Sequence, residues 1–265
     1  MLLRRVMEHV KAQNWTAVAI DFVIVVFGVF IGIQLGNWNQ SRADASLERD
    51  FLAKIVVDLQ SDAQNLQSGI DMADINVRAA YYTLDQAGLA PASTITLPVD
   101  VAVIPGGQLD VAAPADMSDE DKRHLWALAV VRLYPGQSST AFDTLMATGR
   151  LDLIRDHDLV TKLQAYRAQW EDIEAAQTTT FRAFRNQAVF IGQKQGFSPF
   201  AAIPEEEFVA LVRDTPELAG TLRTMMEYSV LHGQVLQRTR QTTLDLLRSL
   251  GAEEAPYSPP GQPNH

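Results

Sequence analysis

The residues able to do acid–base or metal chemistry are few and are scattered along the 265-residue chain. The five histidines follow no common spacing: His9, His124, His157, His232 and His265. His157 stands between Asp156 and Asp158, but consecutive helical residues point to different faces, and no ligand one turn later completes a metal set. We therefore interpret this cluster as the N-cap of a helix.

The other candidate motifs are equally weak. Residues 205–207 are three glutamates after Pro204, which fits the acidic first turn of a helix better than an acid–base pair. His232 lies on a partly apolar helical face, so we expect a packed histidine. The chain has no cysteine and no nucleophile elbow, phosphate loop or zinc-protease motif. We predict no catalytic, cofactor-binding or metal-binding residues, and a protein that is not an enzyme.

The most unusual carboxylate belongs to Asp21, because it is the charged residue inside a long apolar run. At about 1.5 Å per helical residue, residues 15–36 are long enough to cross a hydrocarbon layer of roughly 30 Å. Trp15 and Trp38 bracket the run, as expected of indole rings that anchor a span at the two membrane interfaces. We predict a transmembrane helix over 15–36.

A cleaved signal peptide is the competing interpretation of this run. Ala43, Asp44 and Ala45 resemble a small-residue cleavage site. The apolar run ends at Ile33, about ten residues earlier, which is further than cleavage normally tolerates. We favour an uncleaved anchor.

Three glycines give the span a second unusual feature. Gly28, Gly32 and Gly36 form two overlapping G-x-x-x-G units, and residues four apart line one helix face where a second backbone can approach closely. Asp21 lies seven residues before Gly28, so it projects from nearly the same face. We predict that these four residues pack the span against another helix. The alternative is that glycine is simply common in spans and that Asp21 reaches the headgroups.

The charge distribution sets the expected topology. Residues 1–14 combine an apolar stripe with Arg4, Arg5 and Lys11, which predicts an amphipathic segment on the cytoplasmic membrane surface. Residues 40–265 carry 19 Lys or Arg against 30 Asp or Glu, a net charge of −11, and we expect this part in the bacterial periplasm. A body with this negative charge repels the phosphate backbone of nucleic acids. We therefore predict no nucleic-acid partner.

The remaining sequence predicts an all-α body in the form of an up-and-down bundle of long helices. Residues 40–87 form a stalk helix with one apolar stripe, which Gly88 ends. Residues 88–117 are an irregular insertion, or a small β-hairpin built from the runs STITL and DVAVI. Residues 118–251 form the bundle, whose first helix opens at Ser118 and runs to Pro135, and residues 252–265 are a disordered, proline-rich tail.

One later helix has the heptad spacing of a packed, coiled-coil-like seam. Its members are Leu159, Leu163, Tyr166, Trp170 and Ile173.

Two patterns in the chain together resemble a known family. The first is an acid and a glycine followed by Gln-x-x-Asn-Trp-Asn: Asp21, Gly28, Gln34, Asn37, Trp38 and Asn39. The second is a helix–helix corner, at Leu145, Gly149, Leu151, Leu153 and Ile154. Both resemble a family of uncharacterised bacterial proteins with one N-terminal transmembrane helix. The resemblance implies a single-span topology and a helical body over about half of the chain, and no known activity.

Two functions fit these features. The first is a non-enzymatic interaction or scaffold protein of the bacterial inner membrane, homo-oligomeric through its span, with the lipid bilayer and a membrane or envelope protein as partners. The alternative is a periplasmic bundle that senses a small ligand and signals through a membrane partner. Aromatic side chains could line such a site, although core packing explains them equally: Tyr81, Tyr82, Trp126, Tyr166 and Trp170. A cavity with converging polar groups would favour the sensor, and a continuous apolar surface stripe the scaffold.

Overall fold

The computed structural model describes residues 15–96, 108–111 and 117–257, with side chains from residue 19 onward. The predicted amphipathic segment 1–14 and the residues beyond 257 lie outside this part. The chain divides into two compact units, and the boundary lies between Phe51 and Leu52. The described residues are all-α apart from one two-stranded hairpin, as predicted.

The elements follow in the order α2 (Trp15–Gln86), β1 (Thr94–Thr96), β2 (Gln108–Asp110), α3 (Asp119–Lys122), α4 (Leu125–Val130), α5 (Thr140–Ala147), a 3-10 turn (Leu151–Leu153), α6 (His157–Ala176), a π turn (Gln177–Phe181), α7 (Arg182–Lys194), α8 (Glu205–Asp214) and α9 (Pro216–Ser249). The predicted span and stalk are thus assigned to one helix, α2. Gly88 ends α2 with a positive φ of 75°, and the amide of Leu89 bonds back to the carbonyl of Leu84.

Several local predictions are confirmed by the hydrogen bonds. The Ser118 side chain accepts from the amide of Asp121, and the Asp156 carboxylate accepts from the amide of Leu159, so both residues cap helices as their types suggest. The hairpin pairs β1 with β2 in antiparallel register, Thr94 opposite Asp110. The run DVAVI, which we predicted as a strand, lies outside the described residues.

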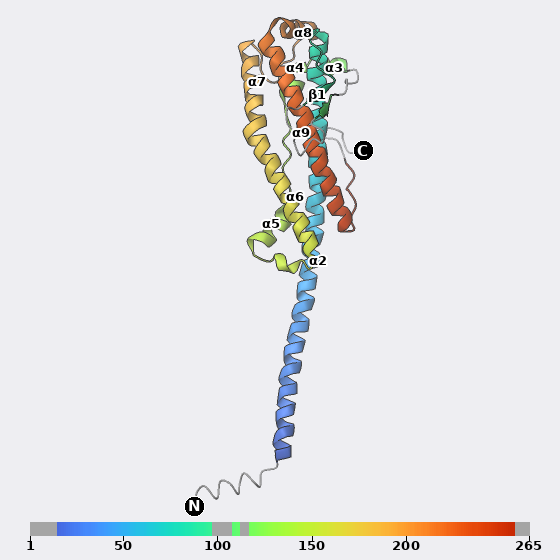
Figure 1. Cartoon of the computed structure of the whole chain (residues 1–265), viewed down its shortest axis with the longest axis vertical. Coiled ribbons are helices and arrows are strands. Elements are labelled where there is room, and N and C mark those ends of the chain that lie inside the picture. The colour runs from blue at the N-terminus through green and yellow to red at the C-terminus, as the bar shows by residue number, and fades with distance from the viewer. Residues whose placement is uncertain (1–14, 97–107, 112–116, 258–265) are drawn as a thin grey trace, which may run out of the picture. The chain divides into compact units, whose positions relative to one another are not determined.

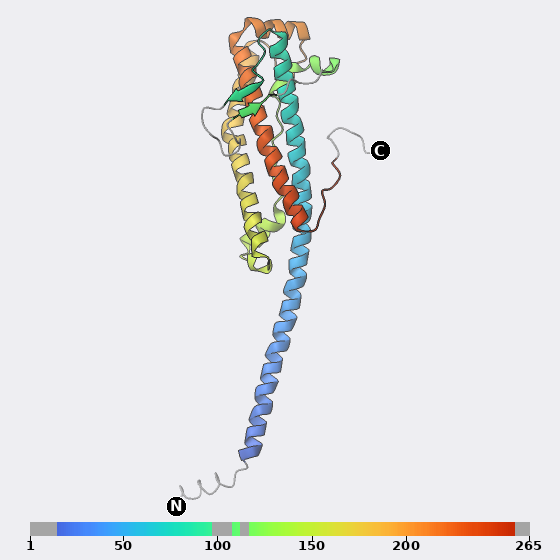
Figure 2. The ribbon, with the colours of Figure 1, turned by 45° about the vertical axis from the view of Figure 1, so that its right-hand side comes forward.

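Helix α9 contacts most other helices of the second unit. It contacts α4, α6, α7 and α8, and Gly69 and Ala73 of α2 approach its Leu236 and Gly233. The continuous rod of α6, the π turn and α7 runs along α9 in both views (Figure 1, Figure 2). The five seam residues predicted on α6 are all buried. At the far end, Trp126 packs so closely on Gly192 of α7 that an added Cβ would collide with its ring.

Two parts of the body differ from the expectation. The helix predicted from Ser118 to Pro135 is divided into α3 and α4 and ends at Val130. Residues 252–257, part of the tail for which we predicted disorder, instead run against α2. The side-chain amide of Gln60 donates to the carbonyl of Glu253 at 2.8 Å, and the Tyr257 hydroxyl donates to Asp71 at 2.6 Å. The first bond uses a backbone carbonyl and the second a single tyrosine hydroxyl, so tail composition alone did not indicate them.

Candidate ligand-binding cleft

The residues predicted to pack the span lie on an open surface of the first unit. Gly28, Gly32 and Gly36 have no heavy atom within 4 Å of an added Cβ, and Asp21 is exposed. Among the residues that the structure describes, one helix, from Ala19, is long and apolar enough to cross a membrane, with a window of mean hydropathy 2.3. Packing along this face therefore stays a prediction.

The two predicted membrane anchors differ in how fully they are described. The Trp38 ring is 55% exposed, and the guanidinium of Arg42 lies 4.2 Å from its centre. The side chain of Trp15 lies outside the described residues.

A row of polar side chains on α2 (Asn76, Asn65, Asp62 and Asp58) hydrogen-bonds the connection between α4 and α5, and is called the polar row below. The side-chain amide of Asn76 donates to the carbonyls of Leu128 and Val131, at 2.5 and 2.7 Å. These bonds satisfy carbonyls at the end of α4, which explains why the chain leaves the helix there. Further along α2, Asn65 bonds the Gly136 carbonyl at 3.2 Å.

Two carboxylates one turn apart continue this row. Asp62 accepts from the amide of Ser138 at 2.5 Å, and Asp58 accepts from the amide of Ala141 at 3.0 Å. The second bond lies at the start of α5, where unpaired amides favour a negative charge. The connection from Val131 to Ser139 is thereby held along α2, and it carries Tyr134 to the site described next.

A cleft of about 490 Å³ opens beside this connection. Tyr134–Gln137 and Ser139 form one side, α6 forms another through Arg167, Trp170, Glu171 and Glu174, and the π turn and α7 close it with Gln177, Thr178 and Arg182. The volume falls in the usual range for small-molecule sites, about 300–1,000 Å³.

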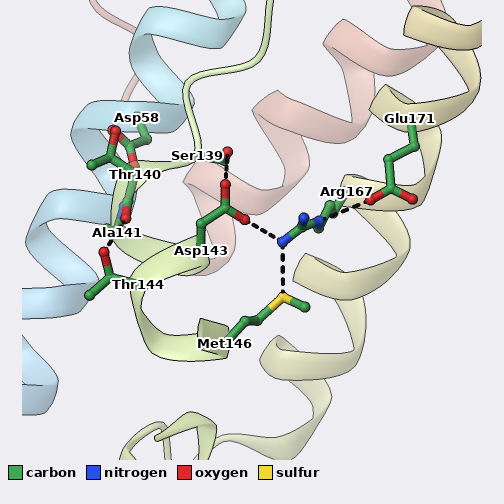
Figure 3. Close-up of polar contacts among 9 residues, drawn as sticks. All are labelled: Asp58, Ser139, Thr140, Ala141, Asp143, Thr144, Met146, Arg167 and Glu171. Carbon is green, nitrogen blue, oxygen red and sulfur yellow. Dashed lines mark hydrogen bonds and ion pairs between the residues drawn. The ribbon is translucent and has the colours of Figure 1, made fainter. Parts of the chain in front are cut away.

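Arg167 ties two walls of the cleft together (Figure 3). Its guanidinium forms ion pairs with Asp143 of α5 and with Glu171 one turn later on α6. Asp143 in turn accepts from the Ser139 hydroxyl at 2.6 Å. One guanidinium is therefore shared between two carboxylates, which leaves a net charge of −1 on the three side chains.

The π turn forms the floor of the cleft at Gln177. The following threonines explain the irregularity, because the Thr178 and Thr179 hydroxyls bond back to the carbonyls of Glu174 and Ala175, at 2.8 and 2.6 Å. Such bonds compete with the regular helical ladder, and π turns occur frequently at functional sites. Gln177 is only 6% exposed, and its Nε2 has no hydrogen-bond partner among the described residues.

A half-buried cation, Arg132, lies next to the same turn. Arg132 stacks over the Phe181 ring, 5.0 Å from its centre, and donates to the Ser229 hydroxyl at 2.5 Å. Burial lowers the pKa of Arg132 to about 10, and Tyr134 acts in the opposite direction. Arg132 is therefore charged at neutral pH.

His232 occupies the other side of Phe181, with ring centres 4.8 Å apart. Burial, and then the charge of Arg132, lowers the pKa of His232 to about 3, so its ring is neutral at pH 7. Its exposed fraction of 4% confirms the prediction of a packed histidine. It borders a second, largely apolar cavity of about 410 Å³ between α6 and α9.

In the described part of the chain, no three His, Cys, Asp or Glu side chains are placed to hold a metal ion. Among the aromatic residues proposed from the sequence, Trp170 lines the cleft, whereas Trp126 is packed in the apolar core. Sequence reasoning missed Tyr134 and Gln177, which both line the cleft. The threonine run after Gln177 was the signal that could have pointed to the turn.

Comparison with known proteins adds no identification: no family model, no curated protein and no solved structure matches the chain. The resemblance to the family of single-span bacterial proteins therefore stays a prediction. Fold and geometry alone define the class. The described part of the chain is all-α apart from one small hairpin, with one helix apolar enough to cross a membrane and a polar cleft in its helical body.

Proposed function

We propose that this protein is a single-pass protein of the bacterial inner membrane whose helical body binds a small molecule in the cleft and signals through a membrane partner. The N-terminus is cytoplasmic and the acidic body is periplasmic. The observation that carries this function is the cleft floor, where the buried amide of Gln177 has no partner among the described residues. Buried polar groups are normally satisfied, and an unsatisfied one beside a cavity marks a place for a ligand or an ordered water.

The span supports a second function, a self-associating scaffold. Gly28, Gly32 and Gly36 leave space around their Cα atoms on one face of the apolar helix. Such a face suits close packing against a second copy in the bilayer. The two functions are compatible, because a sensor that passes its signal to a partner within the membrane also needs a contact surface there.

The test of the sensor function is to block the cleft and leave the fold intact. Thr178 lines the cleft and is exposed, so Thr178→Trp fills part of the opening without entering the core. Thr221 on α9, which is half-buried and lies outside the cleft, is the control, since it is also a helical threonine whose hydroxyl bonds the carbonyl four residues earlier.

The full-length protein in detergent micelles is screened against a metabolite library by thermal unfolding. We expect compounds that raise the Tm of the wild type and of Thr221→Trp but not of Thr178→Trp. If every stabilising compound acts equally on Thr178→Trp, the cleft is not the binding site.

A further inference from the structure

The second cavity, of about 410 Å³ between α6 and α9, shares no lining residue with the cleft. The two helices run antiparallel in both views (Figure 1, Figure 2), and two contacts fix how they face each other. The hydroxyl oxygens of Tyr166 and Thr243 lie 2.9 Å apart near one end, and the ring centres of Phe181 and His232 lie 4.8 Å apart near the other. Positions that advance along α6 therefore face positions that recede along α9.

One end of this cavity is apolar. Its lining there consists of Ala176 and Phe181 on one side and Leu231 and Val235 of α9 on the other. Phe181 is buried, whereas the other three are half-buried, so part of this apolar surface is exposed to solvent. His232 completes the wall with a ring that is neutral at pH 7 and adds no charge there. An apolar groove bordered by polar residues is typical of a ligand site.

The opposite end of the cavity carries one charge of each sign. Asp172 of α6 and Arg238 of α9 are both exposed, and both line the cavity. They lie nearly level on the facing helices, because each is about one and a half turns from its member of the Tyr166–Thr243 pair. A ligand head that carries both charges matches this end, whereas a lone carboxylate would be repelled by Asp172 while it is attracted by Arg238.

We propose that the cavity between α6 and α9 binds a zwitterionic single-chain phospholipid, with its acyl chain along Phe181, Leu231 and Val235 and its headgroup between Asp172 and Arg238. The phosphate faces Arg238, because a guanidinium suits bidentate contact with phosphate oxygens, and the ammonium group faces Asp172. From Arg238 to Leu231 the groove extends about 10 Å along α9. Its volume of about 410 Å³ lies in the lower part of the range of small-molecule sites, which favours one chain over two. This inference does not depend on the proposed function of the cleft, because the two sites share no lining residue.

The test uses the full-length protein in lipid nanodiscs, because detergents are themselves single-chain amphiphiles and would compete for the groove. The probes are a lysophosphatidylcholine and a fatty acid of equal chain length, each with a photoreactive diazirine near the end of the chain. Labelled peptides are mapped by mass spectrometry. We expect the lysophosphatidylcholine to label residues 173–181 and 231–239 at a level that saturates and that the unlabelled lipid displaces. Labelling that does not saturate, or that spreads evenly over the helices of the body, would overturn the proposal.

A variant that fills the groove tests the position of the acyl chain. Val235→Trp should reduce the labelling at least about tenfold. Val57→Trp, at an exposed valine of α2 outside the cavity, is the control and should be labelled as the wild type is. Equal labelling of Val235→Trp and the wild type refutes the site. If Val235→Trp does not fold, the headgroup variants decide.

Two substitutions test the headgroup. Arg238→Gln and Asp172→Asn should each weaken labelling by the lysophosphatidylcholine about 2- to 5-fold, the usual size for an exposed charge pair, and the exposed Asp214→Asn should have no effect. With the fatty acid, Asp172→Asn should instead strengthen labelling, because a repulsion is removed. Stronger labelling by the fatty acid than by the lysophosphatidylcholine, or no effect of Asp172→Asn on the latter, refutes the zwitterionic head. If neither probe labels the groove and a photoreactive amino acid at position 235 joins two copies of the chain, the groove is an interface between copies and the proposal fails.

Discussion

Replacing Asp62 by asparagine tests how the polar row on α2 is protonated. Asp62 has an exposed fraction of 0%, and burial raises its pKa from 3.8 to about 7, opposed by the bond from the Ser138 amide. Its second oxygen accepts a hydrogen bond from the Tyr166 hydroxyl at 2.8 Å. The Tyr166 oxygen in turn lies 2.9 Å from the hydroxyl oxygen of Thr243. Asp58, one turn earlier on α2, raises the pKa further by repulsion.

The protonated carboxyl completes this network better than the ionised one. When Asp62 is ionised, Thr243 has one hydrogen for two acceptors, the Tyr166 oxygen and the carbonyl of Thr239 at 3.0 Å. When Asp62 is neutral, it donates to Tyr166, Tyr166 donates to Thr243, and Thr243 donates to Thr239. An asparagine amide can donate in the same direction, so Asp62→Asn mimics the neutral acid at every pH.

The magnitude follows from the two pKa values. Between about pH 4 and pH 7 the folded protein binds a proton at Asp62 that the unfolded chain does not, so this group's stabilising contribution is lost as the pH rises. A shift of roughly three units corresponds to about 4 kcal/mol over that window. The free energy of unfolding of Asp62→Asn, relative to the wild type, should therefore increase by about that amount from pH 4 to pH 8.

The assay is urea unfolding of the full-length protein in micelles at a series of pH values. Tryptophan fluorescence reports on the network directly, because Trp170 packs edge-on against Tyr166 with ring centres 6.4 Å apart. Asp214→Asn, at an exposed position ending α8, is the control and should follow the wild-type curve. Parallel curves for Asp62→Asn and the wild type, within about 1 kcal/mol, would refute the reasoning.

Two further predictions concern glycines. Gly192→Ala places a Cβ against the rigid ring of Trp126 and should lower the free energy of unfolding by about 1–3 kcal/mol, measured by the same urea titration. Gly220→Ala, in an exposed turn of α9 with open space around it, should instead raise it by up to about 1 kcal/mol; equal effects would show that packing on Trp126 is not what matters. Gly32→Leu should reduce self-association in a membrane two-hybrid reporter, because a large side chain keeps the helices apart, whereas Phe30→Leu on the opposite face should not. A wild-type signal from Gly32→Leu would exclude packing through that face.

Periodicity and capping chemistry were sufficient to predict most helices, because those signals are local. The seam on α6 and the caps at Ser118 and Asp156 are of this kind. The site was not predictable in the same way. Asp62 occupies the place on α2 where the apolar stripe breaks between Leu59 and Leu66, but a polar residue in a stripe does not show which backbone amide it will meet.

The connection after α4 illustrates the same limit. Its sequence continues to favour a helix. The helix ends because the side-chain amide of Asn76 donates hydrogen bonds to the carbonyls of Leu128 and Val131, and Asn76 lies 52 residues from Leu128 in the sequence. Tyr134 reaches the cleft only as a result of that distant contact. Gln177 likewise becomes a floor residue through the irregular turn that the threonines produce.

The four α2 side chains that bond to the connection also fix its position along the axis of α2. Asn76, Asn65, Asp62 and Asp58 bond to points spread from Leu128 to Ala141, all on one helix. A slide of α2 by a single residue, about 1.5 Å, would carry every one of these partners out of reach together. The connection that forms one wall of the cleft is therefore held to α2 at four points that would be lost together.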